Sequence, residues 1–344
     1  MEKLDNLVRP NVRALNPYSC ARDDFKGHEG IFLDANENPF GKLNRYPDPY
    51  QSELKSAIAV IKDMPTENIF LGNGSDEIID LCFRIFCEPG SDRALTFSPT
   101  YGMYQVSAAA NNVELIRIPL NDDFDIDFSR VEPYLNESSL KLIIICSPNN
   151  PTANVMNRQA IRKIISSFRG MVLIDEAYKD FNDEPSFSQV LNDYPNLIVM
   201  QTFSKAWGMA SLRIGMAFAA TGVIAYFNKM KPPYNISSIN QETALNKIRK
   251  NYSSVRKEVG KIIAERERMS GQLKKMPCIL EVFHSDANFI LVKTRNADLI
   301  YSLLVKEGII VRNRSSVIKD CIRITMGTKS ENNKLLKALK NINL

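Results

Sequence analysis

The sequence predicts an α/β protein with a mainly parallel central sheet covered by helices, followed by a smaller α+β domain. Short β-rich runs alternate with amphipathic helical stretches between about residues 69 and 219. Two of these runs, 140–146 and 171–174, are continuously apolar, which is typical of strands buried on both faces in the middle of a parallel sheet. The expected strands are 69–71, 93–97, 113–118, 140–146, 171–174, 197–200 and 214–218.

Helix signals divide the rest of the chain. Ser75, Asp76 and Glu77 form a cap with early acidic residues, and apolar residues at helical spacing follow until Pro89-Gly90. A polar stretch at about 252–275 predicts an extended, exposed helix. Beyond it we expect strands at 279–283, 288–293, 309–311 and 321–325, with helices at 297–306 and 329–341. We therefore predict an N-terminal arm (1–30) that joins the small domain, a large domain (31–240) and a small C-terminal domain (241–344).

Composition excludes several classes of function. Hydrophobic residues are 44% and charged residues 24% of the 344, and no apolar run approaches the roughly 18 residues of a membrane span. The net charge of +5 is spread along the chain, so neither nucleic-acid nor membrane binding is predicted. Six cysteines without a CxxC pair and two histidines predict no metal site. With no secretory signal recognised at the N-terminus, we expect a cytoplasmic protein with reduced thiols.

Several polar residues follow predicted strands in an order that suggests cofactor chemistry. Lys205 lies among small and apolar residues, and burial with positive neighbours favours the neutral amine that a Schiff-base nucleophile requires. Arg213, eight positions on, has a guanidinium suited to a phosphate. Asp175 ends a buried run and either pairs with a protonated pyridine nitrogen or caps a following helix. Tyr178 is placed to hydrogen-bond a phenolic oxygen on the same ring.

Two turns accompany these side chains. The segment 72–76 (Gly-Asn-Gly-Ser-Asp) follows a strand and begins a helix, so it is either a phosphate-binding turn or an ordinary glycine turn. The segment 147–152 (Ser-Pro-Asn-Asn-Pro-Thr) either fixes an amide side chain for hydrogen bonding or is simply a tight turn. The joint occurrence of both turns with Asp175, Lys205 and Arg213 favours a single cofactor site.

Together these motifs resemble the fold-type-I, pyridoxal-5′-phosphate-dependent aminotransferases, and within them the histidinol-phosphate aminotransferases. The resemblance covers nearly the whole chain. The segments that carry it are 33–39 (Leu-Asp-Ala-Asn-Glu-Asn-Pro), 45–48 (Arg-Tyr-Pro-Asp), 72–77, 99–104 (Pro-Thr-Tyr-Gly-Met-Tyr), 147–152, the segments around Asp175 and Lys205, 311–313 (Val-Arg-Asn) and 322–327 (Ile-Arg-Ile-Thr-Met-Gly).

The resemblance implies roles for individual residues. Lys205 would bond to the cofactor and shuttle a proton, Asp175 would keep the pyridine nitrogen protonated, and Tyr101 would stack on the ring. Tyr178 and Asn150 would contact the ring hydroxyl. The cofactor phosphate would be held by backbone groups of Ser75 and Asp76, by the side chains of Thr202, Ser204 and Arg213, and by Tyr46 from the partner subunit of a homodimer.

The implied reaction is transamination between L-histidinol phosphate and 2-oxoglutarate, giving imidazole-acetol phosphate and L-glutamate, in histidine biosynthesis. Arg323 would pair with the carboxylate of glutamate, and Tyr18, Asn36 and Arg312 would form the pocket for histidinol phosphate. Three enzymatic or regulatory alternatives remain open. They are an aromatic or broad-range aminotransferase, a threonine-phosphate decarboxylase of the same fold, and a cofactor-binding regulator without turnover.

Three positions depart from the usual pattern of the superfamily. Ala153 and Ser211 stand where glycine is usual, and Met216 replaces a common aromatic residue. Because a Cβ makes positive φ angles costly, we expect neither Ala153 nor Ser211 to have a left-handed backbone.

Overall fold

The computed structural model describes residues 4–18 and 30–342, and its large domain is built on a seven-stranded sheet. The strand order is β1-β7-β6-β5-β4-β2-β3, and all neighbours are parallel except that β7 is antiparallel to β1 and β6. All seven expected strands are confirmed within two residues at each end. They are β1 (Ile69–Asn73), β2 (Arg93–Ser98), β3 (Glu114–Pro119), β4 (Leu140–Cys146), β5 (Met171–Asp175), β6 (Leu197–Thr202) and β7 (Ile214–Ala219).

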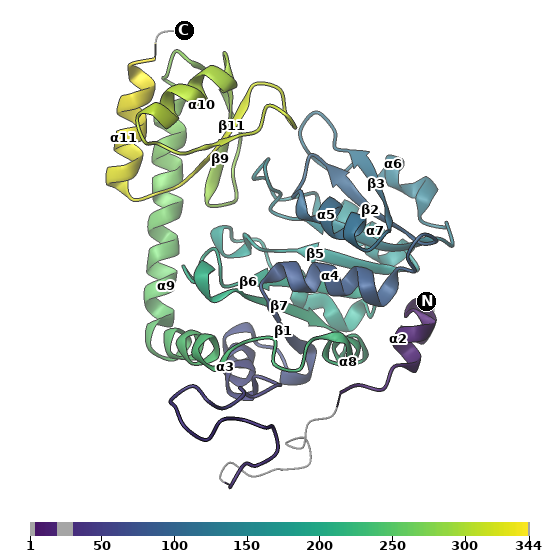
Figure 1. The fold of residues 1–344 in the computed structure, drawn as a ribbon. Coiled ribbons are helices and arrows are strands. Elements are labelled where there is room, and N and C mark those ends of the chain that lie inside the picture. Colours follow the sequence, from purple (N-terminus) through teal and green to yellow (C-terminus); the bar gives the residue numbers. More distant parts are fainter. Residues whose placement is uncertain (1–3, 19–29, 343–344) are drawn as a thin grey trace.

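Helices cover both faces of this sheet (Figure 1). Apolar residues of α3 (Ser52–Lys62) and α7 (Arg158–Ser167) share one core cluster with the sheet, and those of α4 (Ser75–Phe86), α5 (Met103–Ala110) and α8 (Thr221–Met230) share the other. Consecutive residues of β4 alternate between the two clusters, which explains its continuous apolar run. The shorter elements are α6 (Phe128–Val131), η2 (Thr66–Asn68), η3 (Glu132–Tyr134), η4 (Lys179–Phe181), η5 (Phe187–Asp193) and η6 (Ala210–Leu212).

A 36-residue helix, α9 (Ser238–Leu273), runs from the large domain into the small one (Figure 1). It begins 14 residues before the predicted helix, where the Ser237 hydroxyl accepts a hydrogen bond from the Asn240 amide. Its first turns are mostly polar, and only a thin apolar stripe packs against the large domain, so their periodicity is weak. Because α9 contributes to both cores, the predicted domain division at residue 240 stays a prediction.

The small domain has a four-stranded antiparallel sheet in the order β10-β11-β9-β8, with two helices on one face. The expected strand at 309–311 is displaced to Arg312–Asn313, because Ile309 and Val311 pack at the edge of the apolar core while the pairing with β11 begins at Arg312. The elements are β8 (Ile279–Val282), β9 (Phe289–Thr294), α10 (Ala297–Lys306), β10 (Arg312–Asn313), β11 (Cys321–Thr325) and α11 (Lys329–Lys340).

The N-terminal helices α1 (Leu4–Leu7) and α2 (Pro10–Ala14) pack on the large domain. Tyr226 of α8 donates a 2.8 Å hydrogen bond to Asp5, and Lys229 donates one of the same length to the carbonyl of Arg13. Leu7, Val8 and Val12 join the core cluster of α4 and α8, and this apolar contact is the physical reason for the placement. The expectation that the arm joins the small domain therefore does not hold for residues 4–14. Residues 19–29 lie outside the described part of the chain.

Candidate active site

A cavity of about 180 Å³ lies at the edge of the large sheet where β5 and β6 end. Every residue predicted to hold the cofactor lines it except Tyr46. The lining residues are Ser75, Asp76, Tyr101, Cys146, Asn150, Asp175, Ala177, Tyr178, Thr202, Ser204, Lys205, Arg213 and Arg323. Ligands collect at such an edge in open α/β sheets because the loops after parallel strands converge there. Arg213 differs in that it precedes β7, and it reaches the same edge because β7 runs antiparallel.

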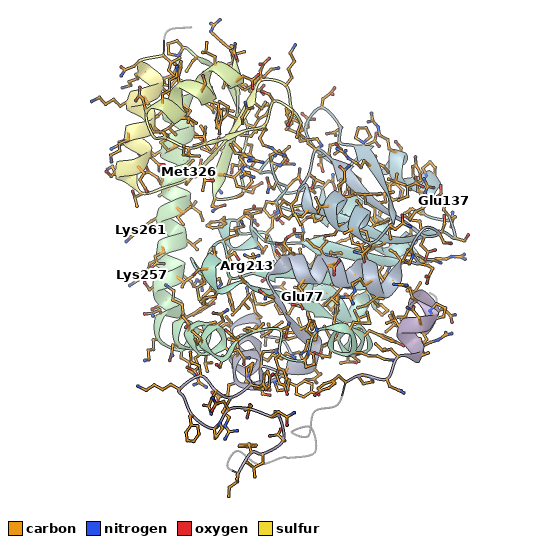
Figure 2. The ribbon with its side chains drawn as sticks, viewed as in Figure 1. Glu77, Glu137, Arg213, Lys257, Lys261 and Met326 are labelled. Carbon is orange, nitrogen blue, oxygen red and sulfur yellow. The ribbon has the colours of Figure 1, made fainter. Side chains whose placement is uncertain are left out.

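One end of the cavity is a cradle suited to a phosphate. Gly74 (φ +77°) precedes α4, a 12-residue helix, and a Cβ at Gly74 would lie 2.5 Å from Nη2 of Arg213. Arg213 also lies 3.3 Å from Oδ2 of Asp76, near the N-terminal end of α4 (Figure 2). The Thr202 and Ser204 hydroxyls are 3.0 Å apart beside it. Free helix amides, a guanidinium and hydroxyls are the groups that bind a phosphate.

A buried carboxylate, Asp175, lines the same cavity at the end of β5. Its Oδ2 accepts a 2.7 Å hydrogen bond from Tyr104, and its Oδ1 accepts one of 2.9 Å from the Ala177 amide. Burial raises the pKa of Asp175 to about 6, although these hydrogen bonds and the charge of Lys205 favour the ionised form. A carboxylate in this position has a strong tendency to bind a cationic N–H donor placed in the cavity.

Tyr104 was missed by the sequence analysis. It lies on the apolar face of α5 and is fully buried, so its position resembles that of an ordinary core residue. Two features of the sequence could have identified Tyr104. A tyrosine on the apolar face of a helix needs a hydrogen-bond partner for its hydroxyl, and Tyr104 is only three residues from Tyr101, which was predicted for the site.

Lys205 reaches the cavity from the loop after β6. Its Nζ lies 5.6 Å from the centre of the Tyr178 ring. The pKa of Lys205 is lowered, first by burial and then by the charge of Arg323, while Asp175 acts in the opposite direction. Burial and the charge of Arg323 both make the amine easier to deprotonate, as the role of a nucleophile or general base requires.

Polar side chains from both domains are hydrogen-bonded to one another in the cavity that Lys205 lines. Asn150 donates a 3.3 Å hydrogen bond to the Tyr178 hydroxyl, and Arg323 of the small domain donates one of 2.5 Å to Oδ1 of Asn150. Burial raises the pKa of Tyr178, so it stays a neutral hydrogen-bond donor. Tyr101 donates a 3.3 Å hydrogen bond to Asp76 and borders the cavity.

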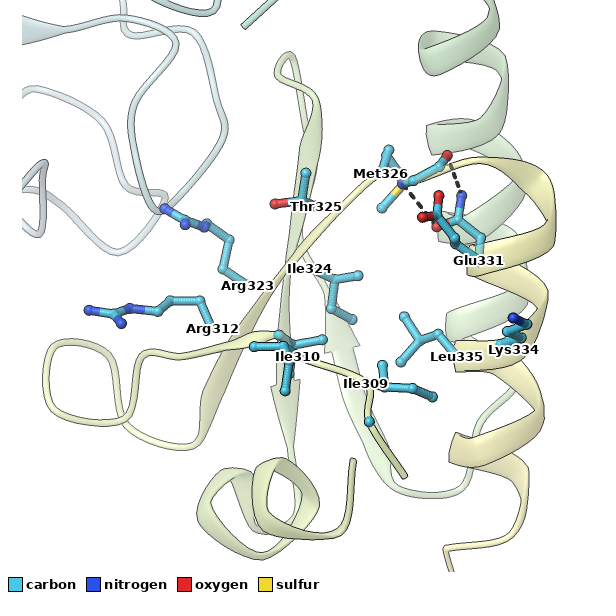
Figure 3. Close-up of a pocket in the computed structure, with 14 residues that line it drawn as sticks. Ile309, Ile310, Arg312, Arg323, Ile324, Thr325, Met326, Glu331, Lys334 and Leu335 are labelled. Carbon is cyan, nitrogen blue, oxygen red and sulfur yellow. Dashed lines mark hydrogen bonds between the residues drawn. The ribbon is translucent and has the colours of Figure 1, made fainter. Parts of the chain in front are cut away.

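The residues predicted for the substrate pocket are only partly together. Arg312 and Arg323 are register partners on β10 and β11, and both side chains point away from α11 (Figure 3). The 180 Å³ cavity of this chain is not lined by three of the residues predicted for the substrate, Tyr18, Asn36 and Arg312. It is not lined by Tyr46 either. Tyr18 is 70% exposed, and Tyr46 stacks on Tyr234 with ring centres 4.4 Å apart.

The backbone expectation for Ala153 was wrong. Its φ of +71° is left-handed, and the position is held by two 2.8 Å hydrogen bonds, from its amide to the Asn149 carbonyl and from the Asp286 amide to its carbonyl. Ser211 lies in η6 and has no positive φ. Met216 is buried within β7.

Over the described ranges 4–18 and 30–342, no group of three metal-ligating side chains is found. In the same part of the chain, no helix combines the length and apolar character needed to cross a membrane.

Comparison with known proteins assigns this architecture to a family. The family described as aminotransferase class I and II matches residues 26–339. The chain belongs to this family. Its relatives within the aminotransferases include the histidinol-phosphate aminotransferase of Parabacteroides distasonis, which is 50% identical with complete coverage of both chains. The enzyme of the same name from Cytophaga hutchinsonii is 48% identical over 98% of each chain.

Solved aminotransferase structures share the fold. The histidinol-phosphate aminotransferase from Clostridium acetobutylicum has a TM-score of 0.79 at 26% identity, covering 87% of this chain and 90% of that one. The Sinorhizobium meliloti enzyme, solved in complex with pyridoxal-5′-phosphate, also has a TM-score of 0.79, at 24% identity over 89% of each chain. An L-threonine-O-3-phosphate decarboxylase from Porphyromonas gingivalis has a TM-score of 0.73 at 21% identity over 87% of this chain and 90% of that one, so the fold alone does not separate these activities.

Proposed function

We propose that this aminotransferase exchanges an amino group between L-histidinol phosphate and 2-oxoglutarate, with pyridoxal 5′-phosphate as cofactor. The observation that carries the proposal is the single cavity that joins the phosphate cradle, Lys205 and Asp175. The choice of substrate is supported by relatives of that name that are about half identical over their full length.

The residues present fit this cofactor. The cradle at Arg213 matches a phosphate, the amine of Lys205 in the same cavity matches an aldehyde, and Asp175 matches a protonated pyridine nitrogen. Asn150 and Tyr178 supply donors for a ring oxygen. When bound, the cofactor supplies an electron sink for the carbanion at the substrate Cα.

The side chains of this chain divide the remaining work. Lys205 would move the proton between the substrate Cα and the cofactor carbon, and burial lowers the pKa of its amine in favour of this role. Arg323 binds the α-carboxylate of glutamate, and its hydrogen bond to Asn150 links that carboxylate to the ring-binding residues. Arg312 would bind the phosphate of the other substrate, and its place as the register partner of Arg323 supports this role.

We further propose that the active enzyme is a homodimer in which Tyr46 contributes to the site of the partner subunit. Tyr46 does not line the cavity of its own chain. The irregular segment 30–51 that carries it stands away from the sheet (Figure 1). This segment carries large apolar side chains with very high exposure, which a second copy would cover. They are Ile31 (92%), Leu33 (89%), Phe40 (83%) and Leu43 (73%).

A cytoplasmic location is proposed with the same activity. Free thiols are typical of proteins in a reducing compartment. In the described part of the chain the free thiols are Cys82, Cys87, Cys146, Cys278 and Cys321.

The function is tested by a substrate panel on protein saturated with cofactor. We expect turnover with imidazole-acetol phosphate and glutamate, and Lys205→Ala should abolish it together with the visible absorbance of the lysine-bound cofactor. The matched control is Lys179→Ala, which removes another lysine whose pKa is lowered by burial but which lies outside the cavity. An active Lys205→Ala variant would falsify the assignment.

The panel also separates the alternatives. Preference for phenylpyruvate identifies an aromatic aminotransferase, and release of CO₂ from threonine phosphate identifies a decarboxylase. Cofactor binding without exchange of the substrate α-proton identifies a regulator.

A further inference from the structure

Three arginines lie on one face of the small sheet, and one of them, Arg323, lines the candidate active site. Arg312 pairs with Arg323 across β10 and β11, so both side chains lie on the same face. Asn313 points to the opposite face, where it donates a hydrogen bond of 2.5 Å to Asp298 of α10. The ladder continues with a 2.9 Å hydrogen bond from the Arg314 amide to the Cys321 carbonyl. Strand alternation therefore returns Arg314 to the face of Arg312 and Arg323.

Among the residues that the structure describes, this arginine cluster (Arg312, Arg314 and Arg323) takes part in no ion pair with a carboxylate. The hydrogen bond of Arg323 goes to the uncharged amide oxygen of Asn150. The Nε atoms of Arg314 and Arg323 are buried and lack hydrogen-bond partners in the described chain. The pKa of Arg314 is lowered by burial and by the charges of Arg323 and Arg312. The pKa of Arg323 is lowered first by burial and also by the charge of Arg312.

Three neighbouring cations without anions repel one another, and their buried N–H groups are left without partners. An arrangement of this kind is relieved by a bound anion. A single guanidinium fork is enough for the α-carboxylate of glutamate, and Arg323, the only one of the three that lines the 180 Å³ cavity, is placed for it. A phosphate monoester carries close to two charges near neutral pH and three terminal oxygens, and it can accept from two forks at once.

We propose that Arg314 is a specificity-determining residue that binds the phosphate group of the substrate together with Arg312. The inference rests on the proposed function and deepens it. Arg323 serves the carboxylate substrate, while Arg312 and Arg314 discriminate the phosphorylated amine from its unphosphorylated form. The division explains why the small domain presents more positive charge than one carboxylate requires.

The test is the transfer of an amino group from three donors, L-histidinol phosphate, L-histidinol and L-glutamate, by cofactor-saturated enzyme. We expect Arg314→Gln to raise KM for histidinol phosphate by roughly 10- to 100-fold, the range for losing a charge-assisted hydrogen bond. KM for histidinol and for glutamate should change by less than about twofold, since neither uses the Arg314 fork. Arg314→Lys, which keeps the charge but not the fork, should fall between wild type and Arg314→Gln.

The matched control is Lys319→Gln, which removes one positive charge from an exposed side chain in the same loop. It should behave as wild type toward all three donors. Inorganic phosphate provides a second readout, because a phosphate bound at Arg312 and Arg314 repels the glutamate carboxylate at the neighbouring Arg323. It should therefore inhibit glutamate turnover in wild type and much more weakly in Arg314→Gln. Cofactor saturation keeps the cradle at Arg213 occupied during this measurement.

An equal rise in KM for all donors, or none for histidinol phosphate, would overturn the assignment of Arg314 while leaving the proposed function intact. If wild-type enzyme does not accept histidinol phosphate, the proposed function fails, and phosphate inhibition then decides the role of Arg314 on its own. If Arg314→Gln does not fold, Arg314→Lys carries the same comparison, and unchanged KM values in that variant overturn the proposal.

Discussion

The Tyr104 hydroxyl donates a 2.7 Å hydrogen bond to Oδ2 of Asp175, and the tyrosine is fully buried while the aspartate is 4% exposed. The two residues come from α5 and β5, which are adjacent only in the folded molecule. With the Ala177 amide on Oδ1, both carboxylate oxygens are oriented by donors. Tyr104 is therefore a positioning residue for the group that we propose to meet the pyridine nitrogen.

Replacing Tyr104 by Phe should weaken cofactor binding by about tenfold at neutral pH. The hydrogen bond favours the ionised carboxylate, so its loss raises the pKa of Asp175 above about 6 and reduces the charge available to the cofactor. Equilibrium dialysis at pH 6 and pH 8 measures the effect, which should be larger at pH 6. Tyr226→Phe is the control, because it removes a tyrosine–aspartate hydrogen bond far from the cavity. Equal affinities for Tyr104→Phe and wild type at both pH values would refute the role.

Asp175→Asn should stabilise the cofactor-free protein relative to wild type above pH 6. The folded-state pKa of Asp175 is about 6, whereas the ordinary pKa of an aspartate is 3.8, so the folded state binds the proton more tightly than the unfolded state. Its contribution to stability is present below pH 4 and is lost as the pH rises through 6, by at most about 3 kcal/mol. Urea unfolding at pH 5 and pH 8 measures the difference, and a difference that does not change with pH contradicts the assignment.

Ala153 should tolerate glycine but not valine. In Ala153→Gly, relief of the left-handed backbone is worth about 1–2 kcal/mol. Loss of a buried methyl and a more flexible unfolded chain offset it, so the change should stay within about 1 kcal/mol. A β-branched side chain at φ +71° should cost at least about 2 kcal/mol. The urea midpoints of both variants test this, with Ser211→Val as a control that should change little. A stable Ala153→Val variant would show that this backbone can rearrange.

Mixing two inactive variants should restore activity if Tyr46 acts across a dimer interface. In a heterodimer of Lys205→Ala with Tyr46→Ala subunits, one of the two sites combines an intact lysine with an intact tyrosine. Random reassociation should therefore recover about a quarter of wild-type activity. Analytical ultracentrifugation confirms that dimers are present, and a Tyr46→Phe partner shows whether the hydroxyl is needed. The shared-site proposal fails if the mixed dimers stay inactive.

Elements whose position depends on neighbouring residues in the sequence were predicted more accurately than elements whose position depends on distant packing. Strands β4 and β11 were predicted with their observed limits, because the pattern of apolar residues depends on nearest neighbours. The start of α9 and the position of β10 were predicted incorrectly, because both depend on packing against distant elements. Arg213 lines the same cavity as the other residues predicted to hold the cofactor, but the antiparallel direction of β7 that brings it there was not predicted.

The sequence by itself determined the α/β architecture, the seven strands of the large domain and most of the side chains that meet in the candidate site. Periodicity, turns and residue chemistry depend on residues that are close together in the sequence. Only the tertiary structure decided that Tyr104 orients Asp175, that Ala153 is left-handed, that the N-terminal helices lie on the large domain, and that Arg314 joins Arg312 and Arg323. These relationships depend on strand register, burial and long-range contacts, which arise only when distant segments pack together.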